Sequence, residues 1–300
     1  MGDNSPLISK KRILFEKLMN FKAKTFGWWK YGLKHKVEKK LLAENSAFKG
    51  RYTGKRCFIL GNGPSLKQVN FSLLTNEYVF TVNQITRNPN FSKLKTNFHF
   101  WADPAFFKIN ENKAEDLELL NVMKSVRTED NNPLVFMPID RKMFVEKFRL
   151  ADSLNIRYFK SDLVFNPDFG EINYAKTTPG FGTVVQWCIA MAIFMGFSEI
   201  YLLGCDNTSI ITNIDAFLKN QVQDYTYQIT ENEQKRMQSL FDNKTLYEYA
   251  QSYTRVLLDY IHLYDYTKSR GIQLINCTEK SAIDRIPFKS LQDVLLEREN

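Results

Sequence analysis

A cluster of glycine, amide and hydroxyl residues follows a short apolar run near residue 60. The run RCFIL (56–60) ends at GNGPS (61–65). Glycine allows a backbone to approach a ligand closely, and a helix that begins at the Pro-Ser pair would point free N–H groups into the same space. The stretch is neither a dinucleotide fingerprint, because Leu66 stands at the third glycine position, nor a Walker loop, because no Gly-Lys-Ser/Thr follows. It predicts an anion-binding loop or, alternatively, a structural turn.

Polar residues close three further apolar runs in the same way. YVFTV is followed by Asn83 and Gln84, FHFWA by Asp103, and EIYLLGC by Asp206 and Asn207. In a parallel sheet, ligands bind in the crevice beyond the carboxyl ends of the strands. We therefore expect these side chains to converge with the glycine loop on one binding site.

Two other segments have the composition of ligand contacts. TTPGFG (177–182) offers the hydroxyls of Thr177 and Thr178 and the open backbone of Gly180 before an apolar helix, although a simple helix entry capped by threonine fits as well. The polar stretch 207–248 is long for a connection, which is typical of a lid or an acceptor-binding insertion, with Tyr225 and Tyr227 as contact residues. A surface insertion without a role is the alternative.

The elements that must position these residues alternate between strands and helices. Apolar runs predict strands near 56–61, 78–84, 96–103, 133–139, 156–160, 199–206 and 272–277, and helices are expected over 64–74, 182–197 and 252–271. Continuous apolar strands that alternate with helices indicate a sheet buried on both faces. The expectation is an α/β, Rossmann-like domain over residues 55–300, with a mainly parallel sheet and helices on both faces.

Residues 1–54 form a basic arm of different character. Residues 1–56 contain 15 Lys and Arg against 4 Asp and Glu, whereas the rest of the chain has a net charge of −3. The arm therefore accounts for the basic balance, and the main domain is not expected to bind nucleic acid. Helical periodicity and Trp28-Trp29 within residues 10–44 predict a basic amphipathic helical arm on an anionic membrane surface. The alternative is packing on its own domain or on another subunit of a homo-oligomer.

The remaining composition indicates an intracellular protein. Cys57, Cys188, Cys205 and Cys277 are far apart in the sequence, without the spacing of a zinc site, and suit buried free thiols. No apolar stretch is long enough to cross a bilayer, and no signal peptide is recognisable. We expect a cytoplasmic protein, peripheral at the inner face of a bacterial plasma membrane.

The order of these motifs resembles the bacterial sialyltransferases of glycosyltransferase family 42. GNGPSL, the strand that ends in NQ, DPAFF and TTPGFGTVVQWCIAMAIFMGFSEIYLLGCD carry the resemblance, over about residues 55–285. The same features are shared with a broader domain family that includes archaeal pterin pyrophosphokinases. The resemblance implies a Rossmann-like domain that binds a CMP-linked sugar without a cofactor or a metal.

Site roles follow from the resemblance. It implies that the nucleotide-sugar donor is bound by Gly61, Asn62, Gly63, Ser65, Asn83, Thr177, Thr178, Gly180 and Asp206. The family's catalytic histidine follows a tyrosine in a Tyr-x-x-His setting, but here YAQS provides Tyr249 and places Ser252 at the histidine position. Tyr249, Asp103 and His262 are therefore the candidate catalytic residues, and Gln84, Asn207 and Tyr225 join the candidate substrate contacts.

The functional expectation is a glycosyltransferase that moves sialic acid or a similar sugar to a cell-surface glycan, in lipopolysaccharide or capsule synthesis. Direct displacement at the anomeric carbon would need a base for the acceptor hydroxyl and groups that stabilise the leaving phosphate. Two alternatives remain open at this stage. One is a magnesium-dependent pyrophosphokinase-like phosphotransferase, with Asp103 and Asp206 as ligands. The other is a nucleotide-binding protein without catalytic activity.

Overall fold

Eight parallel strands form a single sheet in the computed structural model, which describes residues 14–22, 32–208, 210–211, 214, 225–241 and 245–297. The strand order is β6-β5-β4-β3-β2-β1-β7-β8. This confirms the Rossmann-like α/β class and the parallel sheet. The strands are β1 Arg56–Leu60, β2 Tyr78–Val82, β3 Phe98–Phe100, β4 Leu134–Pro138, β5 Asn155–Val164, β6 Thr177–Gly180, β7 Glu199–Leu203 and β8 Gln273–Asn276.

The central strands are apolar at almost every position because helices or turns cover both faces of the sheet. In β1, Cys57 and Ile59 pack on one face and Phe58 and Leu60 on the other, and all four are fully buried. Neighbouring parallel strands are in simple register, with Phe58 opposite Val79 of β2. The pattern is that of a doubly covered parallel sheet.

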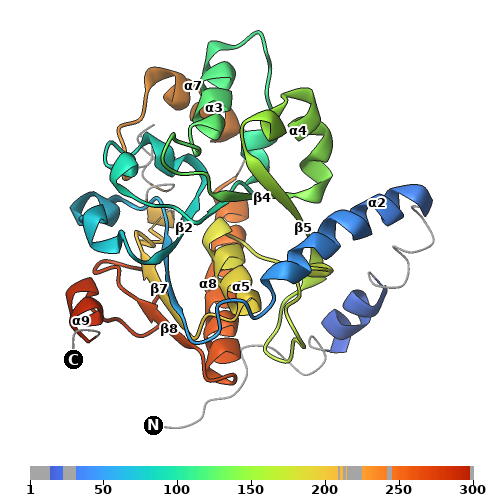
Figure 1. Cartoon of the computed structure of the whole chain (residues 1–300), viewed down its shortest axis with the longest axis vertical. Helices are drawn as coiled ribbons and strands as arrows, with labels where there is room; N and C mark the ends of the chain where they lie inside the picture. Colours follow the sequence, from blue (N-terminus) through green and yellow to red (C-terminus); the bar gives the residue numbers. More distant parts are fainter. Residues whose placement is uncertain are drawn as a thin grey trace.

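Helices α5 Val184–Met195 and α8 Leu246–Lys268 cover one face, where they lie side by side (Figure 1). Helix α5 ends at Gly196, whose φ of 89° is the left-handed conformation that glycine adopts easily at a helix C-terminus. The opposite face is covered by shorter elements: η2 Pro64–Gln68, η3 Phe71–Leu74, η4 Asn83–Arg87, η5 Phe91–Lys93, η6 Pro104–Phe107, α3 Ala114–Lys124, η7 Ile139–Arg141, α4 Lys142–Lys147, η8 Leu150–Asp152 and α9 Leu291–Leu296. Helix α7 Glu231–Phe241 packs beside α3 (Figure 1).

Three expected elements differ from those observed. The helix expected over 64–74 is two 3₁₀ turns, η2 and η3, separated by the extended residues Val69 and Asn70. The segment 177–180, where no strand was predicted, is the edge strand β6, paired with β5 in parallel. Helix α8 begins at Leu246, six residues before the expected start, because Thr245 and Glu248 form a capping box there.

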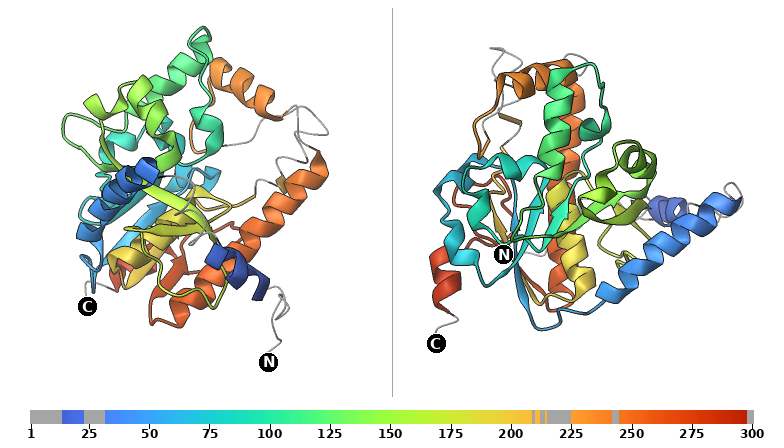
Figure 2. Two further views of the ribbon diagram at one scale, coloured as in Figure 1. Left: turned by 90° about the vertical axis from the view of Figure 1, so that its right-hand side faces the viewer. Right: turned by 45° about the horizontal axis from the view of Figure 1, so that its top comes forward.

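The arm packs on its own domain where the structure describes it. Helix α2 Gly32–Ala43 and η1 Glu44–Phe48 lie against β5, and the buried Asn45 donates hydrogen bonds to the carbonyls of Tyr158 and Tyr174 at 2.7 and 2.9 Å. Residues 14–22 form a further helix at the same end of the sheet, remote from α9 (Figures 1 and 2). Packing on the domain, the alternative raised above, therefore holds for these residues.

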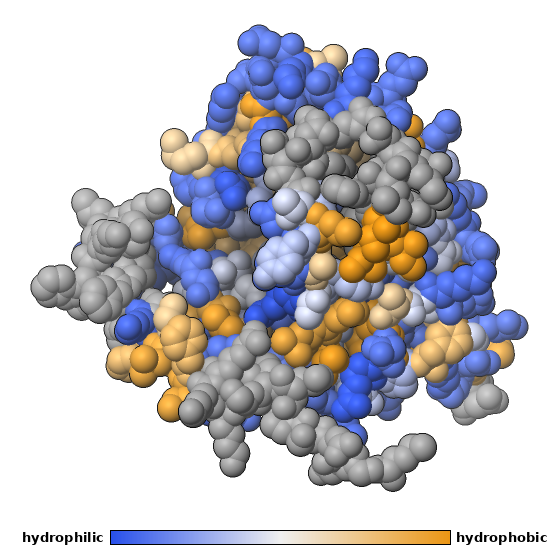
Figure 3. Space-filling model, turned by 180° about the vertical axis from the view of Figure 1, so that it is seen from behind, coloured by the Kyte–Doolittle hydropathy of each residue, from blue (hydrophilic) through white to orange (hydrophobic). Residues whose placement is uncertain are grey.

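The molecular surface is mixed in character. Seen from behind, apolar side chains gather near the middle of the face, and hydrophilic residues dominate its upper and right-hand margins (Figure 3). Among the described residues, no helix combines the length and the apolar character needed to cross a membrane.

Candidate functional site

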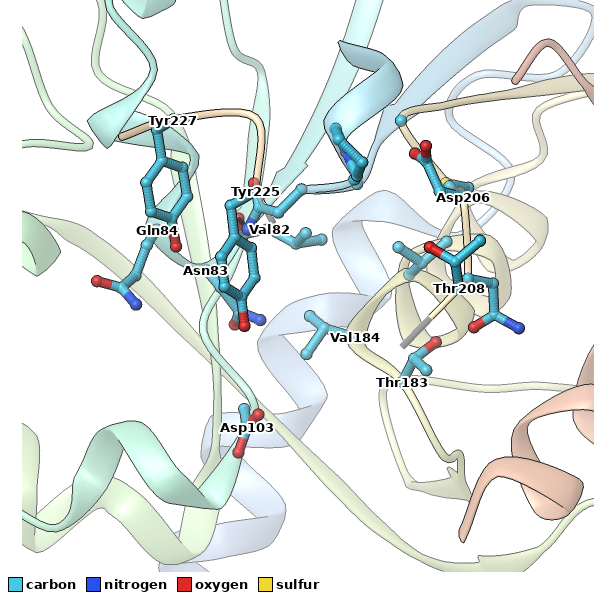
Figure 4. A pocket seen from close by; sticks show the side chains of 18 of the residues that line it. Val82, Asn83, Gln84, Asp103, Thr183, Val184, Asp206, Thr208, Tyr225 and Tyr227 are labelled. Carbon is cyan, nitrogen blue, oxygen red and sulfur yellow. Dashed lines mark hydrogen bonds between the residues drawn. The ribbon is translucent and has the colours of Figure 1, made fainter. Parts of the chain in front are cut away.

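The main cavity lies at the carboxyl ends of the strands, beside the point where the strand order reverses. From β1 the chain builds β2 to β6 on one side and later adds β7 and β8 on the other. A cavity of about 440 Å³ opens there, lined by the ends of β1, β2, β3 and β7, by the start of α5 and α8, and by residues 225–237 (Figure 4). This is where ligands bind in open α/β sheets.

The glycines at the end of β1 allow two backbones to pack closely. The N–H of Gly61 donates to Leu203, and that of Gly63 to Gly204, both at 2.8 Å. A Cβ at Gly61 would lie 2.4 Å from the Gly204 carbonyl oxygen, and one at Gly63 would lie 1.9 Å from a carboxylate oxygen of Asp206. The glycines are thus required for the junction of β1 and β7, whatever the site binds.

Asp206 is tied to this junction through Ser65. Its Oδ1 accepts a hydrogen bond from the Ser65 N–H at 3.1 Å, and its Oδ2 accepts one from the Ser65 hydroxyl at 2.7 Å. Ser65 does not line the cavity, whereas Asp206 does. The N–H group that was expected to face a phosphate is therefore bound to a carboxylate of the protein itself.

Three asparagines present polar atoms at the cavity. The Oδ1 atoms of Asn62 and Asn83 and the Nδ2 atom of Asn207 are buried without a hydrogen bond to any described residue. Asn83 and Asn207 also have positive φ angles of 48° and 51°, a conformation that asparagine tolerates better than most residues. Buried polar atoms normally have partners, so these three are the groups most suited to a bound ligand.

Gln84 connects β2 to the lid, as we call residues 225–237. Its Nε2 donates to Glu233 at 2.5 Å, and its Oε1 accepts from Arg87 at 2.7 Å. Arg87 also pairs with Glu118 of α3 at 2.6 Å, and Glu118 accepts hydrogen bonds from Thr230 and Asn232 of the lid. The network holds the lid over the cavity. Gln84 lines the cavity, but its amide is already bonded.

The lid places aromatic and charged side chains on the cavity wall. The rings of Tyr225 and Tyr227 stack 5.3 Å apart, and the hydroxyl of Tyr225 points toward Asn83 (Figure 4). Burial raises the pKa of Tyr225, and the nearby Glu233 and Asp103 carboxylates add to the increase. Arg236 donates to Asp116 of α3 at 3.2 Å and to the Ala105 carbonyl, and its guanidinium lies over the Phe106 ring.

The start of α5 forms another part of the cavity wall. Thr183, Val184 and Val185 line the cavity, and Thr183 lies near Thr208 on the same side of it (Figure 4). Gln186 accepts hydrogen bonds from the N–H groups of Gly182 and Thr183 at 3.1 and 3.0 Å, and the fully buried Asp259 of α8 accepts a second one from Gly182 at 3.1 Å. Burial raises the pKa of Asp259 to about 6, against the opposing effect of Arg255.

Most of the predicted residues converge on the cavity: Gly61, Asn62, Gly63, Asn83, Gln84, Asp103, Asp206, Asn207, Tyr225 and Tyr249. Thr177, Thr178 and Gly180 do not line it, because they belong to the edge strand β6, and Thr183 stands at the start of α5 instead. His262 does not line it either. It is buried in α8 with its ring 6.4 Å from that of Phe165.

Several cavity residues carried no sequence signal. Glu233, Arg236, Met237 and Tyr260 lie on segments whose placement depends on tertiary packing. One sequence pattern could have indicated these residues. Glu233, Arg236 and Met237 are spaced so that they share one face of a helix, and this spacing is consistent with a helix that buries a polar face against the domain. No group of three or more potential metal-ligating His, Cys, Asp or Glu side chains occurs among the described residues.

The fold and the cavity define an all-parallel α/β protein with a polar site at the topological switch point. The sequence matches the family model described as "6-hydroxymethylpterin diphosphokinase MptE-like" over residues 33–210, which is more than half of the chain. The chain therefore belongs to the MptE-like family, the broader family to which its motifs were compared. No curated protein matches the sequence.

Solved structures of glycosyltransferases are similar to the chain. The sialyltransferase CstII from Campylobacter jejuni, in complex with the substrate analogue cytidine-5'-monophosphate, is 20% identical with a TM-score of 0.43 over 79% of this chain and 85% of that one. The apo α-2,3-sialyltransferase from C. jejuni is 16% identical, with a TM-score of 0.37 over 78% and 80%. The MAf glycosyltransferase from Magnetospirillum magneticum is 13% identical, with a TM-score of 0.43 over 85% and 38%.

Proposed function

We propose that the protein is a glycosyltransferase that moves sialic acid or a similar sugar from a CMP-linked donor to a glycan acceptor. The observation that carries the proposal is the set of three unpartnered amide atoms of Asn62, Asn83 and Asn207 at the switch point of the sheet. An amide side chain offers both hydrogen-bond donors and an acceptor. It can therefore bind a base, a ribose or a sugar, each of which also presents both donors and acceptors. The motif resemblance over residues 55–285 supports the same donor class.

In this reaction the cavity holds the donor with its phosphate toward the strand ends. The anomeric carbon is attacked by an acceptor hydroxyl, and the bond to the phosphate oxygen breaks with its electron pair on the departing nucleotide. Tyr225 and Tyr249 offer hydroxyl groups from the lid and from α8 to the developing negative charge. The lid excludes water, which would otherwise compete with the acceptor for the donor.

The experiment is calorimetric titration with CMP, UDP, GDP and ATP, with and without Mg²⁺. We expect CMP to bind without a metal requirement, and substitution of Asn83 by alanine to weaken it by about tenfold, the effect of losing one good hydrogen bond in a buried site. Substitution of Asn90, which lies outside the main cavity, is the matched control. Strict dependence on ATP and Mg²⁺ would contradict the proposal.

The family name favours a second candidate, a Mg²⁺-dependent diphosphotransferase acting on a pterin-like substrate. Asp103 and Asp206 would be its metal ligands. Both carboxylate oxygens of Asp206 accept hydrogen bonds from Ser65, and Oδ1 of Asp103 accepts one from the Ala105 N–H at 2.9 Å. Metal binding would have to compete with these bonds. The same titrations distinguish the two candidates, because only the second needs ATP and Mg²⁺ together.

Association with an anionic membrane is a further part of the proposal. The helix 14–22 places Glu16 and Asn20 toward the domain, where the side chain of Asn20 bonds to both the N–H and the carbonyl of Val164. Its apolar side chains face outward instead, with exposed fractions from 43% to 66%: Leu14, Phe15, Leu18, Met19 and Phe21. An exposed apolar face flanked by lysines is typical of a helix that lies in a bilayer interface.

Liposome flotation tests this association. The double variant Phe15→Glu, Leu18→Glu should lose binding to vesicles that contain phosphatidylserine, because two charges would enter the apolar layer. The variant Met143→Glu changes an exposed apolar residue on α4, which is 76% exposed, and should bind as the wild type does. Unchanged binding by the double variant would refute the role of this helix.

A further inference from the structure

One lid carboxylate stands out within the cavity wall. Glu233 lies in the first turn of α7, is 2% exposed and lines the cavity. Its Oε1 accepts the hydrogen bond from Gln84, whereas its Oε2 is buried without a hydrogen bond to any described residue. A guanidinium nitrogen of Arg87 lies 3.8 Å from Oε2, too far for a hydrogen bond. One oxygen thus holds the side chain in place and the other retains its acceptor capacity.

The other acidic groups of the cavity are less suited to accept a proton. Both oxygens of Asp206 are bound by Ser65. Oδ1 of Asp103 caps the turn η6, and this side chain is partly exposed to water. The cavity tyrosines, which are Tyr225, Tyr227, Tyr249 and Tyr260, all have pKa values raised by burial and stay protonated near neutral pH.

The surroundings of Glu233 make it a stronger base than an ordinary carboxylate. Burial raises its pKa, and the charge of Glu118 adds to the increase. The hydrogen bond from Gln84 and the charges of Arg236 and Arg87 oppose this effect without cancelling it. The charge of Glu233 in turn contributes to the raised pKa values of Tyr225 and Tyr227, and the charge of Asp103 contributes to that of Tyr225. A general base is most effective when its pKa approaches the working pH.

We propose that Glu233 is the general base that accepts the proton of the acceptor hydroxyl through its Oε2. The inference rests on the proposed glycosyl transfer. As the acceptor oxygen bonds to the anomeric carbon, its proton moves to Oε2, and the bond between that carbon and the phosphate oxygen breaks with its electron pair on the nucleotide. Because Glu233 belongs to the lid, the base reaches the donor only when the lid network is formed.

The test uses the full chain with CMP-N-acetylneuraminic acid as donor and methyl β-galactoside as the probe acceptor, and follows CMP release. The variant Glu233→Gln keeps the size of the side chain and an oxygen for the bond from Gln84. We expect its kcat to fall by about 100-fold or more while the affinity for CMP is unchanged. The acid limb of the wild-type kcat/KM profile should be absent from the variant, because Gln does not titrate.

Added azide distinguishes a general base from a residue that only holds the lid in place. As an anion it has no proton to lose, so it should restore CMP release by Glu233→Gln and yield the glycosyl azide. Glu231→Gln, an exposed acid in the same turn of α7, is the matched control and should behave as the wild type.

Two outcomes overturn the inference alone: an active Glu233→Gln enzyme that keeps its acid limb, or a loss of activity that azide does not restore. Rescue by azide of Asp103→Asn instead would assign the base to Asp103. A wild-type protein that neither binds CMP nor releases it from the donor contradicts the proposed function itself.

Discussion

The floor and the lid of the cavity are built in different ways. The floor consists of the ends of β1, β2 and β7. Their positions are fixed by backbone pairing and by glycines that allow N–H···O hydrogen bonds of 2.8 Å between the segment after β1 and the end of β7. The lid is held mainly by side chains, through Gln84, Arg87 and Glu118, together with one backbone hydrogen bond from the Thr226 N–H to the Asn62 carbonyl at 3.2 Å. A floor built from paired backbone is rigid and can serve for the binding of many ligands. A lid held mainly by a few charged side chains can open, and its side chains determine which reaction the site supports.

The largest effect is expected from Gly63→Ala in the floor. The new Cβ would lie 2.7 Å from the Gly204 carbonyl oxygen and even closer to the Asp206 carboxylate, and the backbone oxygen cannot move without disrupting β7. We expect the free energy of unfolding to fall by about 3 kcal/mol, the upper end for an overpacked site, and CMP binding to be lost. Urea denaturation and calorimetry measure the two effects.

Gly170→Ala is the matched control, because no atom lies within 4 Å of the position of its Cβ. It should leave both stability and CMP binding unchanged. If Gly63→Ala were as stable as Gly170→Ala, the floor would be more compliant than its contacts indicate, and the contrast with the lid would fail.

Sequence patterns predicted the floor and the tyrosines Tyr225 and Tyr227 of the lid, but missed its charged residues Glu233 and Arg236 for a physical reason. Asn83, Asp103 and Asp206 could be grouped because all parallel strands end at one edge, so strand order is not needed to bring their ends together. Glu233 and Arg236 face the cavity only because α7 packs on α3, a contact between segments more than 100 residues apart. Nothing local in the sequence encodes such a contact.

The same reasoning explains the error over residues 177–180. Thr-Thr-Pro-Gly has the composition of a loop, and its proline would interrupt a central strand, but β6 is an edge strand in which proline is tolerated. Ser65 was assigned to the donor because the sequence cannot show that Asp206, 141 positions later, takes its N–H and hydroxyl.

A second prediction concerns Asp259, whose carboxylate accepts a hydrogen bond from the Gly182 N–H just before the start of α5. Because its pKa in the folded state, about 6, is above the usual 3.8, the folded protein binds this proton more tightly than the unfolded chain. The linked contribution to stability therefore decreases as pH rises from about 4 to 6, by up to about 3 kcal/mol for a shift of two units. Asp259→Asn should remove this slope while keeping an acceptor for the Gly182 N–H.

Stability measured by urea denaturation at several pH values between 4 and 7 tests the slope. Asp265→Asn, on the exposed side of the same helix, should retain the wild-type dependence. A variant Asp259→Asn with an unchanged slope would show that burial does not raise the pKa of this carboxylate.

The third prediction targets the lid through Arg87→Met, which removes the charge but keeps the length of the side chain. Glu118 and Glu233 would lose their shared cation, at a cost of about 2 kcal/mol for a partly buried network. Because most of the bonds that hold the lid come from side chains, the loss should appear locally, as faster amide exchange in residues 225–237, with a smaller change in global unfolding. The surface variant Arg141→Met should show neither effect. A purely global loss of stability would remove the distinction between floor and lid.

The smallest effect, and the one that most directly separates structure from binding within the floor, is expected from Ser65→Ala. The hydroxyl donates to a carboxylate that lines the cavity but is itself outside the cavity lining. Its loss should therefore lower the free energy of unfolding by about 1 kcal/mol, the usual contribution of one hydrogen bond, and leave CMP affinity nearly unchanged. Ser72→Ala, in the exposed turn η3, provides the baseline for removing a serine hydroxyl. If Ser65→Ala weakened CMP binding as strongly as Asn83→Ala, Ser65 would contact the donor directly, and the bond to Asp206 would have to exchange for one to the ligand.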